Sequence, residues 1–251
     1  MSDLVLGREG KVATIELARP PHNFFDIELL RDIADALDAN DTDPTVVVTL
    51  LCAQGRSFCA GADFSAGGGD REGARLLYEQ AARIFDRKKL LVAAVGGPAV
   101  GGGLGLAVAA DFRVASPAAR FHANFSALGL HPGFALTATL PELIGFQKAR
   151  ELMMTARRIG GEEALAIGLV DQLSTSELLG SFAMEFAQTI ASRAPLALRS
   201  IREALLRVDG ESARKALDKE LAVQADLFQS DDFKEGVKAS AGRRSPIFKG
   251  C

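Results

Sequence analysis

LLVAAVGGPAVGGGLGLAVAAD, residues 90–111, is the central stretch of this chain, around which the other elements are expected to assemble. Its first six residues, Leu90 to Val95, are apolar and predict a strand that is buried on both faces of a sheet. Glycines and Pro98 then end the strand. From Leu104 onward, small apolar residues predict a buried helix that ends near Asp111. The stretch therefore predicts a strand, a glycine turn and the beginning of a helix.

The beginning of that helix is suited to binding negative charge. The first N–H groups of a helix have no partner inside the helix, and the helix dipole adds partial positive charge there. Gly101, Gly102 and Gly103 would let the atoms of a ligand approach these groups closely. The turn is therefore a candidate site for a phosphate, or for an oxyanion that forms during a reaction.

Two other interpretations of this stretch stay open. No Lys followed by Ser or Thr comes after the glycines, as a P-loop requires, and Leu106 and Val108 interrupt the GxGxxG pattern. The turn could equally serve only to pack a helix tightly on a sheet. A membrane span is the other interpretation, because residues 90–110 carry no charge. The six glycines and one proline inside this range favour a buried core segment instead.

The whole chain has the composition of a globular protein. Of its 251 residues 48% are hydrophobic and 24% are charged, which suits one sizeable domain. The net charge of −3 argues against nucleic acid as the main partner. The three cysteines lie in apolar or terminal contexts, which predicts free thiols in a reducing compartment. The first ten residues, MSDLVLGREG, lack a secretory pattern, so we expect a cytoplasmic protein without a membrane span.

Alternating strand and helix patterns around this stretch predict an α/β protein. Two short strands over 4–6 and 12–17 are expected to pair across a turn. Asp26 is a candidate N-cap for a helix whose apolar residues extend to Leu37, and the β-branched residues over 46–52 predict a central strand. The other expected elements are a helix over 70–88, strands over 112–115 and 121–130, helices over 147–155 and 162–167, one from the capping box Ser174–Glu177, and helices after Pro195, after Gly210 and over 231–239.

The sequence offers little for metal binding or nucleophilic catalysis. His22, His122 and His131 form no HxxxH or HExxH pair, and the cysteines form no CxxC pair. Ser57 lies in GRSFC, which lacks the second glycine of a nucleophile elbow. Cys59, at the end of an apolar segment, is typical of a core residue. We therefore expect no metal site and no serine or cysteine nucleophile.

Several segments together resemble one known family. FCAGADF, residues 58–64, precedes AAVGGPAVGGGLGLAVAADFRVAS, residues 93–116. Further agreements follow in ARFHANFSALGLHPGFALTATLPELIG, GEEALAIGLVDQL, DDFKEGVKAS and the basic end RRSPIF. In this order they resemble the crotonase superfamily, whose best-known members are enoyl-CoA hydratases and isomerases. The resemblance covers nearly the whole chain.

The resemblance implies a fold, a substrate and an assembly. It implies an α/β fold of the crotonase type, a spiral of strand-strand-helix units with a helical C-terminal region. Residues 1–190 would form the spiral core with the acyl-CoA site, and residues 191–251 would form a helical region for oligomerisation and active-site cover. The implied partners are an acyl-CoA thioester and further copies of the chain in a homotrimer or hexamer. Coenzyme A is then part of the substrate, and no separate cofactor is expected.

The resemblance also implies an oxyanion hole and the residues around it. In the family, two backbone N–H groups bind the thioester oxygen as it becomes an enolate or a tetrahedral oxyanion. By position in the motifs, these groups would belong to Ala62 and Gly102. Fixed N–H groups at the start of a helix stabilise such a charge without reorganising. The implied substrate-binding residues are Arg56, Ala60, Gly61, Asp63, Gly101, Asn124 and Phe125, and the basic tail with Arg244 and Lys249 is a candidate phosphate partner.

The sequence departs from the family at its acid–base positions. Typical hydratases carry two glutamates, one that activates water and one that protonates carbon. Counting along the motifs, the first position is Gly105 here and the second is Phe125, where the isomerase glutamate also aligns. Neither side chain can transfer a proton, so ordinary hydration by two glutamates is not expected. His131 is the remaining acid–base candidate because histidine is a common proton donor and acceptor in catalysis, although before a Pro-Gly turn a structural role is the more common one.

Three functions stay open at this point. The first is an enzyme that stabilises a thioester enolate or oxyanion with few side chains, for example in the decarboxylation of a malonyl-type CoA. The second is a hydratase that uses a displaced residue or a bound water. The third is a protein that binds acyl-CoA, or acts as a scaffold, without catalysis. In all three, Phe125, Phe134 and Leu136 predict an apolar acyl pocket, which Phe125 would shorten.

Overall fold

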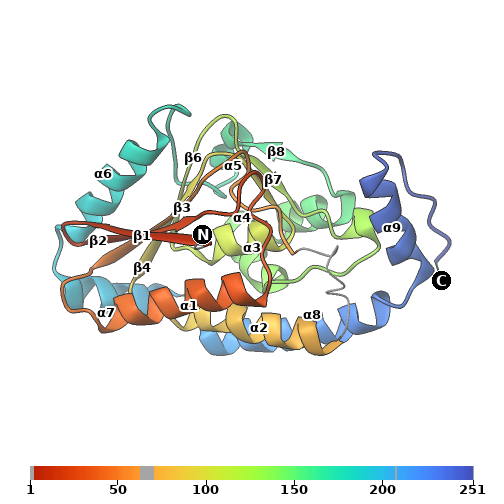
Figure 1. Cartoon of the computed structure of the whole chain (residues 1–251), viewed down its shortest axis with the longest axis horizontal. Coiled ribbons are helices and arrows are strands. Elements are labelled where there is room, and N and C mark those ends of the chain that lie inside the picture. The colour runs from red at the N-terminus through yellow and green to blue at the C-terminus, as the bar shows by residue number, and fades with distance from the viewer. Residues whose placement is uncertain (1–2, 63–70, 207, 251) are drawn as a thin grey trace.

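A six-stranded sheet forms the centre of the fold in the computed structural model, which describes residues 3–62, 71–206 and 208–250. Its strands lie in the order β1-β2-β3-β4-β6-β9, and all neighbours are parallel except the antiparallel pair of β1 and β2 (Figure 1). The strands are β1 (Leu4–Glu9), β2 (Val12–Leu17), β3 (Val48–Ala53), β4 (Leu90–Val95), β6 (Phe112–Ala115) and β9 (Gln172–Leu173). A smaller sheet has the order β5-β7-β8, with β5 (Pro98–Val100), β7 (Arg120–His122) and β8 (Ile159–Gly160).

The central stretch folds as its sequence predicts. Every residue of β4 is buried, as expected for a strand covered on both faces. The following helix, α3 (Gly102–Ala109), begins two residues before the predicted start at Leu104. Its early glycines permit close packing, because a Cβ atom on Gly103 would lie 2.1 Å from the carbonyl oxygen of Cys59. The start of α3 is therefore pressed directly against the segment that follows β3.

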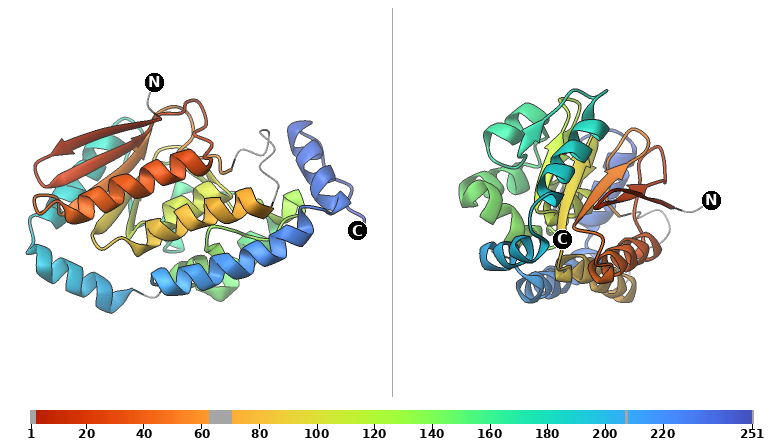
Figure 2. Two further views of the ribbon diagram at one scale, coloured as in Figure 1. Left: turned by 60° about the horizontal axis from the view of Figure 1, so that its bottom comes forward. Right: turned by 90° about the vertical axis from the view of Figure 1, so that its left-hand side faces the viewer.

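Helices cover both faces of the large sheet. On one side α1 (Ile27–Thr42), α2 (Arg71–Asp86) and α8 (Gly210–Leu227) lie side by side, as the left view of Figure 2 shows. On the other side α6 (Leu179–Ala191) packs on β2, β3 and β4. The predicted N-cap of α1 is confirmed, since Asp26 accepts a hydrogen bond of 2.9 Å from the Leu29 N–H group. The remaining helices are α4 (Leu136–Thr155), α5 (Gly161–Ala166), α7 (Pro195–Leu205) and α9 (Asp231–Ala241).

Three sequence-based boundaries are corrected by the structure. The strand predicted over 121–130 divides into β7 and a 3-10 turn, η1 (Ser126–Leu128), where the Leu128 N–H group donates to the carbonyl of Phe125. The helix predicted over 147–155 begins earlier, at Leu136, and Gly145 interrupts it with φ of +77°. The predicted capping box is wrong, because the Ser174 N–H group donates to the carbonyl of Ala115 and extends the sheet edge. Helix α6 therefore begins only at Leu179.

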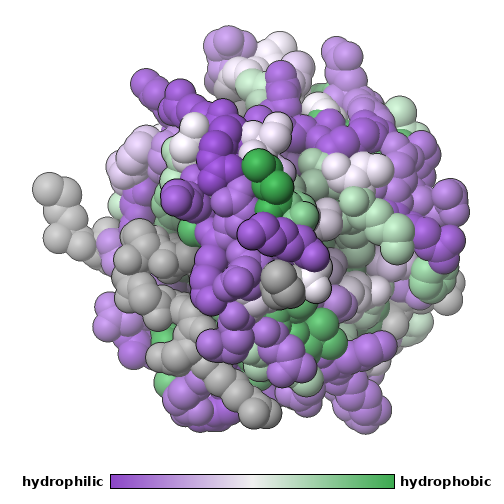
Figure 3. All heavy atoms as spheres, turned by 90° about the vertical axis from the view of Figure 1, so that its right-hand side faces the viewer, coloured by the Kyte–Doolittle hydropathy of each residue, from purple (hydrophilic) through white to green (hydrophobic). Residues whose placement is uncertain are grey.

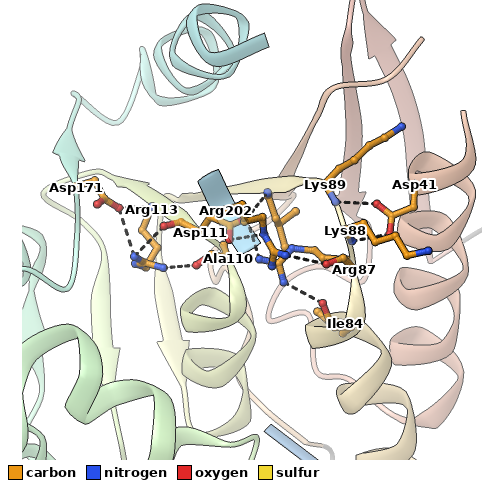
Figure 4. A network of polar contacts seen from close by, with 11 residues as sticks. Asp41, Ile84, Arg87, Lys88, Lys89, Ala110, Asp111, Arg113, Asp171 and Arg202 are labelled. Carbon is orange, nitrogen blue, oxygen red and sulfur yellow. Dashed lines mark hydrogen bonds and ion pairs between the residues drawn. The ribbon is translucent and has the colours of Figure 1, made fainter. Parts of the chain in front are cut away.

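A buried network of charges holds the end of the central stretch (Figure 4). Asp111 does not cap α3 but accepts hydrogen bonds from the Leu91 N–H group at 2.8 Å and from Arg87 at 2.9 Å. Its second oxygen accepts from Nε of Arg202 at 2.8 Å. Beside it, Arg113 donates to the carbonyl of Ala110 at 2.6 Å. The network joins the C-terminal end of α3 to β4 and α7.

No helix in the described ranges is long and apolar enough to cross a membrane. The membrane interpretation of residues 90–110 therefore has no support from the fold. Seen from the end that carries α9, the surface is largely hydrophilic and shows only small hydrophobic patches (Figure 3). The apolar residues of the central stretch lie inside the molecule instead, divided between its two hydrophobic core clusters.

Candidate active site

A cavity of about 660 Å³ lies beside the beginning of α3. Both glycine segments singled out in the sequence line it: Ala60, Gly61 and Ala62 from one, and Gly101 and Gly102 from the other. Further parts of its wall come from α2, from the segment between β7 and α4, and from α8 and α9. The cavity is therefore built from parts of the chain that are far apart in sequence.

Backbone hydrogen bonds hold the two glycine segments side by side. The Cys59 N–H group donates to the carbonyl of Pro98 at 3.2 Å, and the Val100 N–H group donates to the carbonyl of Cys59 at 3.0 Å. These bonds form a parallel bridge between Cys59 and Ala99. Ala62 lies three residues after Cys59, and Gly102 lies three residues after Ala99. The bridge therefore brings both residues to the same cavity.

The N–H groups of Ala62 and Gly102 have no acceptor within residues 3–62, 71–206 and 208–250. Gly102 is the first residue of α3, and the first bond along the helix comes only from Gly105, which donates to the carbonyl of Gly101 at 3.2 Å. Gly101 adopts a φ of +55°, a conformation that glycine takes readily and that turns the chain into the helix. Two donors and the positive end of a helix dipole thus meet at one place, which is the arrangement that stabilises an oxyanion.

Two phenylalanines close over the beginning of α3. A Cβ atom on Gly102 would lie 2.5 Å from Cζ of Phe25, so Phe25 excludes a side chain at this position. A Cβ atom on Gly105 would lie 2.4 Å from Cβ of Phe134, so Phe134 occupies the place where a side chain of residue 105 would begin. The two rings lie 5.7 Å apart between centroids. The site thus combines exposed backbone donors with an apolar wall.

A sequence profile described as enoyl-CoA hydratase/isomerase matches residues 7–251. The chain belongs to the enoyl-CoA hydratase/isomerase family. It is 34% identical to a probable enoyl-CoA hydratase of Bacillus subtilis, and the match covers 100% of both chains. It is 31% identical to the 2,3-dehydroadipyl-CoA hydratase of Escherichia coli, again over 100% of both. The predicted family is therefore confirmed, and the chain is an enzyme of the lyase or isomerase type.

Solved structures of the family share the whole fold. An enoyl-CoA hydratase/isomerase from Pseudoalteromonas atlantica has a TM-score of 0.91 and 30% identity, covering 99% of this chain and 100% of that one. An enoyl-CoA hydratase from Mycobacterium avium subsp. paratuberculosis has a TM-score of 0.89 and 28% identity, covering 99% of each chain. The predicted crotonase-type α/β fold is confirmed.

The polar groups that line the cavity in this family member are neutral or basic. His22 Nδ1 lies 3.1 Å from Oγ of Ser57, and His122 Nε2 lies 2.8 Å from the carbonyl oxygen of Ala156. Burial and the nearby Arg158 guanidinium lower the pKa of His122, although its hydrogen bond to Ala156 opposes this. No Asp or Glu belongs to the lining within the described ranges, nor do these ranges contain a cluster that could hold a metal ion.

The predicted site residues separate into two groups. Ala60, Gly61, Gly101, Asn124 and Phe125 line the cavity together with Ala62 and Gly102. Arg56 is exposed and does not belong to the lining, although the neighbouring Ser57 does. Asp63 lies outside the described residues. The predicted site residues that line the cavity thus belong mainly to the backbone of the glycine segments, and none of them carries a charged side chain.

His131 and the basic tail make other contacts. Nδ1 of His131 lies 2.8 Å from the carbonyl oxygen of Pro132, and the residue does not belong to the cavity lining. Arg244 pairs with the carboxylate of Glu235, and the Lys249 N–H group donates to Asp232 at 2.6 Å. The structure therefore does not bring the acid–base candidate His131 into the cavity that Ala62 and Gly102 line.

Three polar residues near the site went unnoticed in the sequence. Tyr78 lines the cavity and donates to Oε1 of Gln224 at 2.7 Å, and Nε2 of Gln224 donates to the carbonyl of His131 at 2.7 Å. Glu220 lies one turn earlier on α8 and is fully buried. A signal was present: Glu220 and Gln224 continue the helical spacing of the buried Ala213 and Leu217, which places both on the inner face of α8.

Glu220 binds the beginning of α4. One carboxylate oxygen accepts from the Ala135 N–H group at 2.8 Å, and the other accepts from the N–H group of Thr137 at 2.9 Å and from its hydroxyl at 2.5 Å. Burial raises the pKa of Glu220 to about 7, although these three hydrogen bonds act to lower it. The carboxyl group therefore titrates near neutral pH in the folded protein.

Glu220 predicts a pH dependence of stability. The pKa of Glu220 is higher in the folded than in the unfolded chain, so protonation of its carboxyl group favours the folded state. This contribution to the free energy of unfolding is fully present below the pKa of the unfolded chain and is lost as the pH rises through about 7. Relative to Glu220→Gln, which cannot titrate, the wild-type free energy of unfolding should fall by about 2–3 kcal/mol between pH 5 and pH 8. Urea unfolding of both proteins at several pH values measures this difference. A difference that does not change with pH would contradict the prediction.

Proposed function

We propose that this enzyme binds an acyl-CoA thioester in the cavity beside α3 and stabilises an enolate or oxyanion of that thioester. The observation that carries the proposal is the pair of N–H groups of Ala62 and Gly102, which belong to one cavity and have no acceptor in the described part of the chain. A thioester oxygen gains negative charge when the α-carbon loses a substituent or when a nucleophile adds to the carbonyl. Two fixed N–H donors lower the free energy of that state more than they lower that of the bound substrate.

Ordinary hydration by two carboxylates has little support in this cavity. Hydration of a conjugated double bond needs a base for the water and an acid for the α-carbon. The residues at the two family positions are Gly105 and Phe125, and Phe134 fills the space beside Gly105. The described lining holds no carboxylate that could replace them. The proposed reaction therefore depends on the oxyanion site more than on proton transfer by side chains.

Decarboxylation of a malonyl-type CoA is the reaction that suits these residues. The bond between the α-carbon and the carboxylate breaks, carbon dioxide leaves, and the electron pair of that bond forms the enolate. The enolate oxygen accepts hydrogen bonds from Ala62 and Gly102, and a proton from water then adds to the α-carbon. No general base takes part. The apolar wall of Phe25 and Phe134 favours this step, because loss of a carboxylate is easier where water does not solvate it.

A panel of coenzyme A compounds tests the proposal. Isothermal titration with CoA, butyryl-CoA, crotonyl-CoA and methylmalonyl-CoA measures binding, and each bound thioester is then followed for carbon dioxide release and for exchange of its α-protons with deuterium. We expect the thioesters to bind, and methylmalonyl-CoA to release carbon dioxide and to take up a solvent deuterium at the α-carbon. Turnover of crotonyl-CoA at the rate of ordinary hydratases would refute our interpretation of Gly105 and Phe125. Binding without any reaction would favour a non-catalytic acyl-CoA-binding protein, and absence of binding would refute the proposal altogether.

We also propose that residues 1–190 act as the acyl-CoA-binding core and that residues 191–251 serve assembly into a homotrimer or hexamer in the cytoplasm. Helix α7 supports this assembly, because it has no buried residue while Leu196, Ile201 and Leu205 are 79%, 54% and 71% exposed. Apolar side chains gathered on one surface helix are typical of an interface between subunits. Light scattering coupled to size-exclusion chromatography measures the mass of the particle, and a monomer would contradict this part of the proposal.

A further inference from the structure

Phe134 and Ala135 have a backbone conformation that needs support. Their φ angles are +60° and +56°, in the left-handed region that side chains other than glycine rarely adopt. Such residues persist only where the surrounding structure holds them. Phe134 is 1% exposed, and its ring lies between those of Phe25 and Phe85, at centroid distances of 5.7 and 6.3 Å. This conformation presses Cβ of Phe134 against Gly105, so Phe134 forms part of the cavity wall beside the beginning of α3.

Glu220 supplies the support for this conformation. Its two oxygens accept three hydrogen bonds from Ala135 and Thr137, which lie one and three residues after Phe134. No salt bridge to Glu220 is present in the described ranges, and Tyr78 on α2 is the titratable group to which it couples electrostatically. A carboxylate buried without a cation is costly, so its retention here calls for a specific use of its hydrogen bonds. That use is to hold the turn that orients Phe134.

A second contact from α8 holds the same segment. Gln224, one turn after Glu220, donates to the carbonyl of His131 and accepts from the hydroxyl of Tyr78. Gly133 leaves room for the Tyr78 hydroxyl, since a Cβ atom on residue 133 would lie 2.1 Å from its oxygen. The segment from His131 to Thr137 is therefore held from α8 on both sides of Phe134.

We propose that Glu220 is a positioning residue that holds Phe134 as the end wall of the acyl pocket, and that it thereby limits the length of the acyl chain. The inference rests on the proposed function in one respect, namely that the acyl group of a CoA thioester occupies this cavity. Glu220 itself does not belong to the cavity lining and acts through Phe134. A looser turn would let the ring move away from Gly105 and open space for a longer chain.

A double-mutant cycle with two ligands tests this inference. Affinities for butyryl-CoA and decanoyl-CoA are measured by isothermal titration for the wild type, Glu220→Gln, Phe134→Ala and the double variant. We expect Glu220→Gln and Phe134→Ala each to shift the affinity ratio about tenfold toward decanoyl-CoA. In the Phe134→Ala background, Glu220→Gln should shift the ratio no further, because the ring through which it acts is gone. Glu211→Gln is the matched control on the same helix, since Glu211 is exposed and pairs with the exposed Lys215, and it should leave the ratio unchanged.

Several outcomes would overturn the inference. Equal weakening of both ligands by Glu220→Gln would assign Glu220 a general structural role, and additive shifts in the double variant would show that it does not act through Phe134. If Glu220→Gln does not fold, Thr137→Val removes one of the three hydrogen bonds, and the same cycle with Phe134→Ala decides the question. Failure of the wild type to bind either thioester would instead refute the proposed function, which distinguishes the two failures.

Discussion

Replacement of Asp111 by alanine is expected to lower the free energy of unfolding by about 3–5 kcal/mol, because it removes one partner of a buried ion-pair network. The side chain of Asp111 is 12% exposed, while those of Arg87 and Arg202 are 2% and 8% exposed. Burial alone would raise the pKa of Asp111, but the two guanidinium groups and the Leu91 N–H group hold it below its ordinary value. Without this carboxylate, the two buried guanidinium groups would lose the acid with which both of them pair.

An exposed ion pair provides the matched control for this experiment. Asp86 pairs with Arg214, and both side chains are more than 40% exposed. Pairs of this kind contribute about 0–1 kcal/mol, so Asp86→Ala should unfold at nearly the wild-type urea concentration. Urea unfolding at neutral pH compares the three proteins. If the loss for Asp111→Ala were within about 1 kcal/mol of the loss for Asp86→Ala, the network would not stabilise the fold as its burial suggests.

Replacement of Ala62 by proline is expected to slow the reaction of the bound thioester by about 10²–10³-fold, equivalent to about 2.7–4 kcal/mol of transition-state stabilisation. Proline has no N–H group, so one of the two proposed donors to the oxyanion is lost. Binding of the unreacted thioester should change less, because its carbonyl oxygen carries less negative charge than the enolate. The rate of α-proton exchange or of carbon dioxide release measures the effect.

Ala62→Gly is the control for this substitution, because it removes the methyl group but keeps the N–H group. Its rate should remain close to that of the wild type. Thermal unfolding of both variants shows whether the fold is intact, since Gly61 also accepts a hydrogen bond from the Phe25 N–H group at 2.9 Å. Equal rate losses for the glycine and proline variants would mean that the N–H group of Ala62 does not contribute to the reaction.

Much of the fold could be predicted from local sequence patterns. Alternation and β-branched residues identified the strands β1 to β4 because these patterns depend on neighbouring residues alone. The predicted element boundaries that were wrong depend on hydrogen-bond partners that are distant in the sequence. Ser174 extends the sheet because Ala115 accepts its N–H group, and α4 begins early because Glu220 binds its first N–H groups. No local pattern near Ser174 or Leu136 contains this information.

Part of the candidate site could also be predicted from the sequence, and part could not. Position in the motifs predicted that Ala62 and Gly102 would meet, and both line one cavity. The role of Glu220 could not be predicted in this way, since 85 residues separate it from its hydrogen-bond partner Ala135. His131 was a candidate because of its chemistry, yet its ring contacts the next carbonyl. The residue types in a sequence indicate which chemical groups are available. The orientation of these groups depends on how the backbone packs in the folded protein.

Residue types and their order were enough to predict the strand, glycine turn and helix over residues 90–111, the family, and the absence of carboxylates at positions 105 and 125. These properties follow from residue types and from the backbone preferences of nearby residues. The tertiary structure alone decided that Phe134 fills the space beside Gly105 and that Glu220 holds it there. These contacts join residues that are far apart in the sequence. Two such atoms can exclude each other or form a hydrogen bond only after the helices that carry them have packed together.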